Sequence, residues 1–355
     1  MQQSLYYELY KLYMPALVLQ WEQEFQELGY LQDRILGKDF SVSGEWSSIS
    51  EDNSNAMAYV VDMDSPFPRI AQNAVTVTKG LIPKIAAELA FTETDLTEIN
   101  TLRALGIDRN RNQILQRLFK PLKTCYVAQK ERLEYMLKQG LSTGTAYADT
   151  TNNTGAGIAV DFGFKAENKF NASVVWGQPS ATPLKDITNT VLAKAEEDGV
   201  SVVKAYMNQK TFNFIANDSQ AKALVYPDVN SVQMQFATPL DKLNTALMAQ
   251  FGFVIEIVKG KNTLVRDGKK VVVDGWKDGM ISFSTEAEVG SLVWARLAED
   301  EDRVNGVDYE TAEEFILLRK YKTVYPNYAE YNSSQSRSLC VLKNNIYLFD
   351  STATA

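Results

Sequence analysis

Apolar residues recur every three or four positions in two stretches of the chain, and this spacing predicts two long helices. The first covers residues 3–30, and the second covers about residues 109–141. Pro15 lies inside the first and Pro121 inside the second. Because proline lacks a backbone N–H, we expect a kink or a break at each of them. Gly29 is expected to end the first helix.

Between the two helices the pattern becomes β-like. Residues 41–58 are rich in Ser, Asn, Glu and Asp, and we interpret them as a loop. Two β-type runs follow at 59–61 and 74–78, with two prolines between them. Two strands joined by a long, turn-rich tip are only marginally stable in water by themselves. The pattern therefore predicts an extended two-stranded arm that must lie against another surface.

In the second half of the chain, helices alternate with buried strands. Thr182 followed by Pro183 is a helix start, with a capping residue before proline at the first helical position. An Asp-Gly pair between two β-type runs predicts a hairpin over 262–274. We expect a compact α/β domain over about 182–298, followed by an acidic run at 299–302 and further strands.

The composition narrows the chemistry that the chain can perform. It has 355 residues, 36 Lys and Arg against 44 Asp and Glu, a net charge of −8 and no His. Without His there is no Ser-His-Asp or Cys-His nucleophile pair, no imidazole acid or base, and no mixed Cys/His zinc site. The negative balance argues against broad binding to nucleic-acid phosphates and leaves only local basic patches open.

The cysteines and the chain start bear on the compartment. Cys125 and Cys340 are too few for a disulfide framework, so a reducing compartment is favoured. Cys125 lies on the apolar stripe of the second helix, and we interpret it as a buried structural thiol. The first six residues have no basic region followed by an apolar run, so we expect no secretory signal. No run reaches about 18 apolar residues, so we expect no membrane span.

A glycine pair and several acidic clusters are the remaining chemical candidates. Gly155 and Gly157 do not form a phosphate loop, because no Lys-Ser or Lys-Thr follows them and the strand comes after them. No acidic cluster has the spacing of a calcium loop. Catalytic carboxylates meet in space rather than in sequence, so a carboxylate-based hydrolase on the 182–298 domain stays open. We predict no cofactor and no metal.

Aromatic residues and two arginines point to protein contacts. The chain has 17 Tyr, 16 Phe and 5 Trp, and Tyr and Trp are enriched at protein interfaces. Arg109 and Arg111 open the second helix, either as a solvent-exposed end or as a contact with a neighbouring acidic surface. This composition favours assembly over solitary catalysis.

Several short segments, taken in order, resemble the major capsid proteins of tailed double-stranded DNA phages with the Hong Kong 97-type fold. The branch that includes the lambda major head protein is the most similar. AQKERLEYMLKQGLSTG at 128–144 resembles the end of that branch's spine helix, and IAVDFG at 158–163 resembles the strand after it. AYMNQKTF at 205–212 resembles a helix start in its axial domain, and a Val-Gly pair at 289–290 resembles a late glycine before a strand. The likeness covers about residues 55–350.

The resemblance implies an α+β fold of the Hong Kong 97 type with an axial α/β domain inserted into a peripheral domain. Its implied parts are an N-terminal arm (1–44), an E-loop (45–82), a peripheral domain (83–181) with a spine helix at about 112–141, an axial domain (182–298) and a return to the peripheral domain (299–355). Pro121 and the longer polar loop depart from the family pattern. These proteins are not enzymes, so no catalytic residue is implied.

The implied function is that of a major capsid protein. It would assemble with itself as hexamers and pentamers into an icosahedral virion head around double-stranded DNA, in the host cytoplasm. Scaffolding, portal and decoration proteins are further expected partners; DNA contact would be loose and non-specific, and no membrane is involved. The expected subunit-interface residues are Tyr6, Tyr10 and Trp21 in the arm, Tyr59, Phe67 and Arg69 in the E-loop, and Arg109 and Arg111 at the spine start.

Three other functions stay open. A groove for a cargo peptide, or a neighbouring cargo gene, would favour an encapsulin-type compartment shell. A tail or connector protein of the virion would differ only in assembly geometry. The carboxylate-based hydrolase would need a deep pocket with two carboxylates about 5–9 Å apart.

Overall fold

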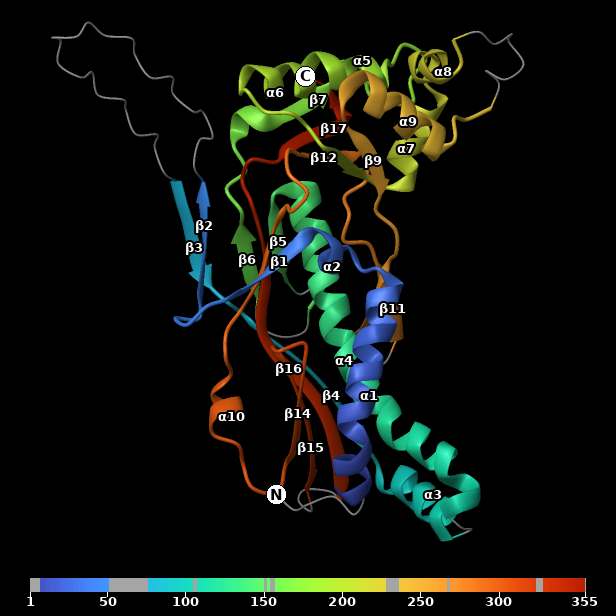
Figure 1. The fold of residues 1–355 in the computed structure, drawn as a ribbon, viewed down its shortest axis with the longest axis vertical. Helices are drawn as coiled ribbons and strands as arrows, with labels where there is room; N and C mark the ends of the chain where they lie inside the picture. The colour runs from blue at the N-terminus through green and yellow to red at the C-terminus, as the bar shows by residue number, and fades with distance from the viewer. Residues whose placement is uncertain are drawn as a thin grey trace, which may run out of the picture.

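The computed structural model describes residues 7–50, 76–104, 107–149, 152–153, 157–227, 236–266, 269–323 and 328–354. Within these ranges the chain forms an elongated molecule with two hydrophobic cores (Figure 1). The larger core surrounds a long central helix and a six-stranded sheet. The smaller core surrounds a five-stranded sheet at the top of Figure 1.

The long helix α4 (Ile107–Thr143) is the central element of the larger unit. Its 37 residues extend over about 55 Å. The expected break at Pro121 was wrong, because the helix runs through this residue. Leu118 and Leu122 on either side are fully buried, and their packing outweighs the hydrogen bond that proline cannot make. The buried positions follow the helical period and include Ile114, Leu118, Leu122, Leu133, Leu137 and Leu141.

The N-terminal helix α1 (Tyr7–Leu28) lies beside α4 and continues through Pro15. Its buried side chains share one face at helical spacing: Tyr10, Met14, Val18, Trp21 and Phe25. Gly29 ends the helix with a φ of 64°, as the sequence predicted. A short helix α2 (Leu31–Ile35) then leads the chain onto the larger sheet.

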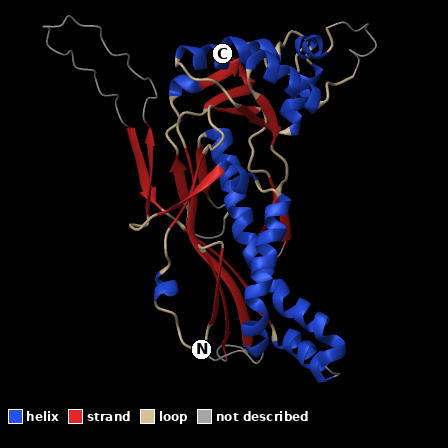
Figure 2. Cartoon of the chain, in the orientation of Figure 1, coloured by secondary structure: helices blue, strands red, loops and turns tan. Residues whose placement is uncertain are grey.

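The larger sheet is built around one long strand, β16 (Ala329–Leu342). The sheet order is β1 (Leu36–Phe40), β13 (Gly290–Trp294), β16, β15 (Ile316–Thr323) and β14 (Asp308–Ala312), with β4 (Lys84–Phe91) also paired to β16. Only the β1–β13 pair is parallel among these described strands. The helices α3 (Glu93–Ala104) and α10 (Ala298–Glu301) lie at its margins (Figure 2).

The smaller sheet lies under a layer of helices (Figure 2). Its order is β7 (Lys169–Ala172), β17 (Tyr347–Thr354), β12 (Met280–Ser284), β8 (Lys204–Met207) and β9 (Val254–Ile257). The helical segments are η1 (Ala166–Asn168), α5 (Pro183–Ile187), the π-helical turn η2 (Thr188–Leu192), α6 (Ala193–Glu197), α7 (Gln209–Asn217), α8 (Ser219–Val225) and α9 (Leu240–Phe251). Asn208 caps α7 by accepting a 2.9 Å hydrogen bond from the Thr211 N–H.

The smaller core does not coincide with the expected axial range of 182–298. It includes Ala172 before that range and Phe349 after it. The reason is that β17 pairs with both β7 and β12, which brings the C-terminal strand into this sheet. Conversely, β13 falls within that range but belongs to the larger sheet.

Three two-stranded ribbons complete the described chain. They are β2 (Glu45–Ser50) with β3 (Thr76–Leu81), β5 (Thr145–Ala148) with β6 (Ile158–Asp161), and β10 (Asn262–Arg266) with β11 (Lys269–Val273). The hairpin expected over 262–274 is confirmed as β10 and β11. The interpretation of residues 41–58 as a loop was wrong for the part that forms β2. The pairing of β2 with β3 and the burial of Trp46 show a strand there. The run expected at 59–61 lies outside the described residues.

Candidate assembly surfaces

The β2–β3 ribbon leaves the body of the protein at a root that Arg337 of β16 holds in place (Figure 1). The Arg337 guanidinium donates hydrogen bonds to the carbonyl oxygens of Gly44, at 2.9 Å, and Ile82, at 3.2 Å. The two strands pair only with each other among the described residues. The root is therefore anchored, while the ribbon has no further sheet to lie in.

Trp46 packs the root of the ribbon against the larger core. Its side chain is only 4% exposed, and its ring lies 6.4 Å from that of Phe162, centroid to centroid. Across the ribbon, Gly80 leaves room for the indole, since a Cβ there would lie 2.8 Å from Trp46 Nε1. The ribbon thus starts from a rigid base. The expected interface residues Tyr59, Phe67 and Arg69 lie outside the described residues.

The arm helix α1 uses its aromatic face within its own chain. Tyr10 is 1% exposed and donates a 3.1 Å hydrogen bond to the Leu118 carbonyl oxygen. Trp21 is 4% exposed and stacks on Tyr126 of α4. In this conformation the protomer itself buries both side chains, so the expectation that they face a neighbour is corrected. Tyr6 lies outside the described residues.

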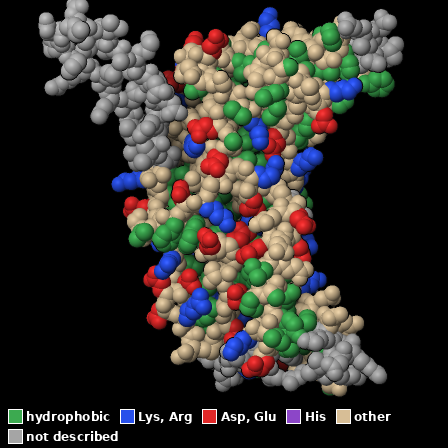
Figure 3. Space-filling model, in the orientation of Figure 1, with side chains coloured by type: hydrophobic (Ala, Val, Ile, Leu, Met, Phe, Trp, Pro, Cys, Tyr) green, Lys and Arg blue, Asp and Glu red, His purple; other side chains and the backbone are tan. Residues whose placement is uncertain are grey.

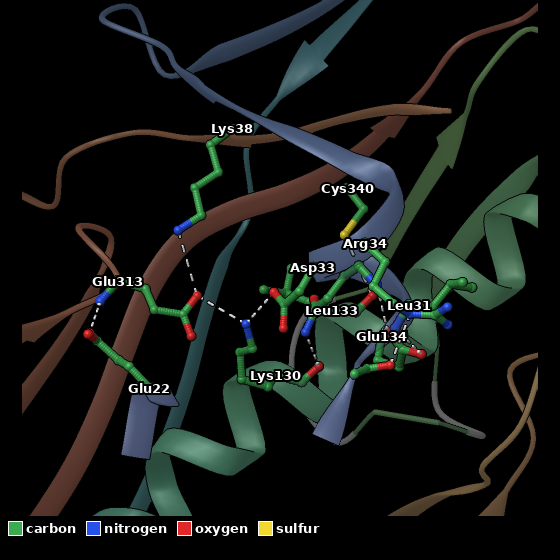
Figure 4. Close-up of polar contacts among 12 residues, drawn as sticks. Glu22, Leu31, Asp33, Arg34, Lys38, Lys130, Leu133, Glu134, Glu313 and Cys340 are labelled. Carbon is green, nitrogen blue, oxygen red and sulfur yellow. Dashed lines mark hydrogen bonds and ion pairs between the residues drawn. The ribbon is translucent and has the colours of Figure 1, made fainter. Parts of the chain in front are cut away.

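A buried charge centre, which sequence reasoning missed, joins the arm to the central helix (Figure 4). Lys130 of α4 forms salt bridges with Asp33 of α2 at 2.7 Å and with Glu313 at 3.0 Å, and its side chain is only 2% exposed. Glu22 of α1 accepts a 2.7 Å hydrogen bond from the Glu313 N–H. Burial acts to lower the pKa of Lys130, but the two carboxylates outweigh it and hold that pKa above its usual value.

An acidic residue of α4, Glu134, holds the start of α2. Glu134 accepts hydrogen bonds from the backbone N–H groups of Leu31, at 3.3 Å, and Gln32, at 3.1 Å. These are the donors that a helix leaves unpaired at its first turn. From the same α2, Arg34 reaches Glu256 of β9 at 2.6 Å. The arm therefore touches both cores of the protein.

A groove of about 800 Å³ lies beside the charge centre, between α1, β1 and β14. Pro15, Val18 and Leu19 form an apolar strip on its α1 side, while Glu310 lines it from β14 and Glu314 from just after that strand. Figure 3 shows one broad face of the molecule, with acidic side chains in its middle region. Burial and the nearby Glu22 raise the pKa of Glu310. Five carboxylates line the groove against two basic side chains, Arg34 and Lys38, so it is negative in character.

The other expected residues are placed only by their backbone. Arg109 and Arg111 lie in the first turns of α4, at the lower end of the molecule in Figure 1, and their side chains are outside the description. The structure does not bring them to the β2–β3 root or to the groove of the same chain.

The chemical candidates take structural roles where the structure describes them. Cys125 is buried as expected, and burial raises the pKa of its thiol to about 12. Glu299 of the acidic run pairs with Arg319 at 2.8 Å. No group of three or more Cys, Asp or Glu in the described ranges has metal-site geometry. None of the helices described here is both long and apolar enough to cross a membrane.

The sequence model of a family described as phage major capsid protein E matches residues 50–309. This span is well over half of the chain. The chain belongs to the phage major capsid protein E family. A comparison with curated proteins finds no match. The family assignment confirms the resemblance to tailed-phage capsid proteins that was found in the sequence.

Solved structures confirm the fold of this capsid protein. A phage-related protein from Bordetella bronchiseptica RB50 is similar with a TM-score of 0.51 at 12% identity, covering 95% of this chain and 96% of that one. A protein of an Escherichia coli CFT073 prophage, proposed to form its capsid, is similar with a TM-score of 0.51 at 10% identity, covering 78% and 79%. The fold is therefore the α+β capsid fold of the Hong Kong 97 type. As a capsid protein, the chain associates with itself into a shell and is located in the virion capsid.

Proposed function

We propose that this capsid protein assembles as hexamers and pentamers into an icosahedral head that encloses double-stranded DNA. We further propose that it forms in the host cytoplasm, performs no catalysis, and contacts scaffolding, portal and decoration proteins. Its net charge of −8 supports loose, non-specific contact with packaged DNA, because like charges limit adhesion to phosphates.

The observation that carries the proposal is the β2–β3 ribbon. Its strands pair only with each other among the described residues, yet its base is fixed by Arg337 and Trp46. An isolated two-stranded ribbon is marginally stable in water. A ribbon with a rigid base and no covering layer is suited to lie across a neighbouring subunit. Leu81 at its base is 70% exposed, and Val42 just before it is 91% exposed.

The proposed subunit contacts follow from this placement. The ribbon, with Tyr59, Phe67 and Arg69 in the segment between its strands, would contact one neighbour. The basic start of α4, with Arg109 and Arg111, would contact another. Tyr6 at the head of the arm stays in this proposed set.

Electron microscopy of the purified, overexpressed chain tests the proposal. We expect closed shells, with five- and six-fold capsomers in averaged images, and a size-exclusion profile dominated by large particles. A chain that stays monomeric at high concentration, with its ribbon protected from proteases, would contradict it. Replacement of residues 51–75 by an Asn-Gly turn, which keeps both strands of the root paired, should abolish shells while leaving the unfolding transition of the protomer in place.

A further inference from the structure

The groove beside α1 has features of a docking site for a strand. It runs along α1 from Pro15 to Gln26, which is about 16 Å of helix. Its α1 side is apolar from Pro15 to Leu19 and polar at Glu22 and Gln26, and Leu19 is 60% exposed. Pro15, one turn earlier on α1, is exposed as well, so the two side chains form a small contiguous apolar patch of the kind found at interaction surfaces.

The charge of the groove selects the chemistry of what could dock there. Lys130 and Lys38 together balance the charges of Asp33 and Glu313, and Arg34, which also lines the groove, pairs with Glu256. Glu310 and Glu314 form no salt bridge within the described ranges. Glu310 lies in β14 and Glu314 just after it, whereas the apolar strip belongs to α1. A segment with apolar side chains and one or more lysines would therefore complement the groove.

The β10–β11 hairpin of the same protein has that character. Lys270 and Val272 of β11 are both exposed, and they share a face because alternate residues of a strand point the same way. Val272 is 63% exposed. The five residues of β11 extend over about 17 Å, which matches the length of the groove. Lys261, just before β10, adds another exposed basic side chain.

The hairpin is held away from the groove of its own chain. Lys138 of α4 donates a 3.0 Å hydrogen bond to the Gly260 carbonyl oxygen, and Asn262 donates one of 3.1 Å to the Glu131 carbonyl oxygen. In Figure 1 the hairpin lies to the right of α1, and β14 lies to its left. A contact between the two features therefore requires two chains. Such a head-to-tail contact closes into rings or continues into larger assemblies.

We propose that the β10–β11 hairpin of one subunit docks into the groove between α1 and β14 of a neighbouring subunit. Val272 covers the apolar strip that Leu19 presents, and Lys270 faces Glu310 and Glu314. This inference rests on the proposed assembly of the chain into capsomers. It adds a contact to those proposed for the ribbon, for the start of α4 and for Tyr6.

Cysteine cross-linking between two separately purified chains tests the contact. One chain carries Leu19→Cys and the other Val272→Cys, so only a contact between chains can join them. A disulfide forms only where the two Cα atoms come within about 7 Å. The native Cys125 and Cys340 are both buried, so we expect little background cross-linking from them. We expect a cross-linked dimer on non-reducing gels after assembly and oxidation. The matched control is Leu12→Cys, which is 66% exposed on α1 but outside the groove, and it should give severalfold less product.

The outcomes separate this contact from the proposed assembly. Shells without a cross-link above the Leu12→Cys control overturn the docking and leave the assembly standing. Absence of both shells and cross-link contradicts both. Attachment of the Leu19→Cys chain to a scaffolding protein instead would assign the groove to that partner and overturn the inference.

Charge reversal gives an independent readout. Lys270→Glu alone, or Glu310→Lys with Glu314→Lys alone, should lower the assembled fraction severalfold by placing like charges together. Combining all three should restore it, because the pairing is then reversed rather than lost. Glu27→Lys, on an exposed part of α1 outside the groove, is the control and should assemble normally. Failure of the combined variant to recover, while it folds with a normal unfolding transition, contradicts the contact.

Discussion

Arg337 donates a 2.9 Å hydrogen bond from Nη2 to the carbonyl oxygen of Gly44, at the turn where the chain enters β2. Gly44 has a φ of 73°, which side chains rarely adopt, and a Cβ there would overlap the guanidinium. One glycine and one arginine, 293 positions apart, thus set where the β2–β3 ribbon leaves the body.

Gly44→Ala should therefore destabilise the protomer and impair assembly. The methyl group both strains the backbone and displaces Arg337, so we expect a loss of about 2–3 kcal/mol in the free energy of unfolding. Urea unfolding measures the loss, and electron microscopy measures the shells. Gly29→Ala is the matched control, because Gly29 has a φ of 64° but no atom within 4 Å of its added Cβ. It should lose only about 1–2 kcal/mol. Equal losses in the two variants would show that the arginine contact contributes nothing.

The long helices were predictable because their apolar spacing is a local signal. The periods over 3–30 and 109–141 match α1 and α4 within a few residues. Pro121 misled the prediction, since the packing of Leu118 and Leu122 that overrides it is tertiary. The strand β2 was missed for a related reason: its residues are mostly polar, and its partner strand begins 26 positions after it ends (76 − 50).

The charge centre could not be predicted from a single sequence. Lys130 meets Asp33 from 97 positions away and Glu313 from 183 positions away. Each of these residues, taken alone, has the pattern of an ordinary charged surface position. The smaller sheet shows the same limit, since nothing local in residues 347–354 indicates that β17 will pair with β7 and β12. Family resemblance supplied the fold class, and the structure supplied the contacts.

Lys130→Met should strongly destabilise the packing of the N-terminal arm against the central helix α4. The substitution keeps the volume of the side chain but leaves Asp33 and Glu313 without their buried cation. Removal of one partner from a buried salt bridge costs about 3–5 kcal/mol, and we expect about 3 here because Asp33 is partly exposed. Lys123→Met is the control, since its pair with Glu24 is partly exposed and should contribute less than about 1 kcal/mol. Similar losses for both variants in urea unfolding would argue that the buried centre has no special role.

Trp21→Ala and Leu12→Ala should separate packing within the protomer from contact between protomers. Trp21 is buried against Tyr126, so its truncation should cost about 3–5 kcal/mol of unfolding free energy. Leu12 is 66% exposed, so its truncation should change stability by less than about 0.5 kcal/mol. Chemical denaturation of the unassembled chain measures both. A small loss of unfolding free energy for Trp21→Ala would support the original expectation that this side chain contacts a neighbouring subunit.

Asp308, in the larger sheet, makes the stability of the protein depend on pH. Burial raises its pKa from the usual 3.8 to about 6, with Glu330 adding to the rise and Lys320 opposing it. Between these two values the folded protein binds more protons than the unfolded chain does. The free energy of unfolding contributed by this group therefore falls as pH rises from about 4 to about 6. Burial lowers the pKa of Lys320 to about 8, so Lys320 stays protonated across this window.

Asp308→Asn should accordingly gain stability relative to the natural chain as pH rises. The variant removes the charge that the folded protein must bury above about pH 6, so the difference in unfolding free energy should grow between about pH 4 and pH 7. We expect a change of about 1–2 kcal/mol, less than the full pKa shift implies, because the carboxylate is only partly shielded from water. Urea unfolding of the unassembled protein at several pH values measures it. Asp39→Asn, at an exposed position of β1, is the matched surface control. If the difference in unfolding free energy between Asp308→Asn and the natural chain is the same at every pH, the buried carboxylate does not titrate in this window and the pH dependence arises elsewhere.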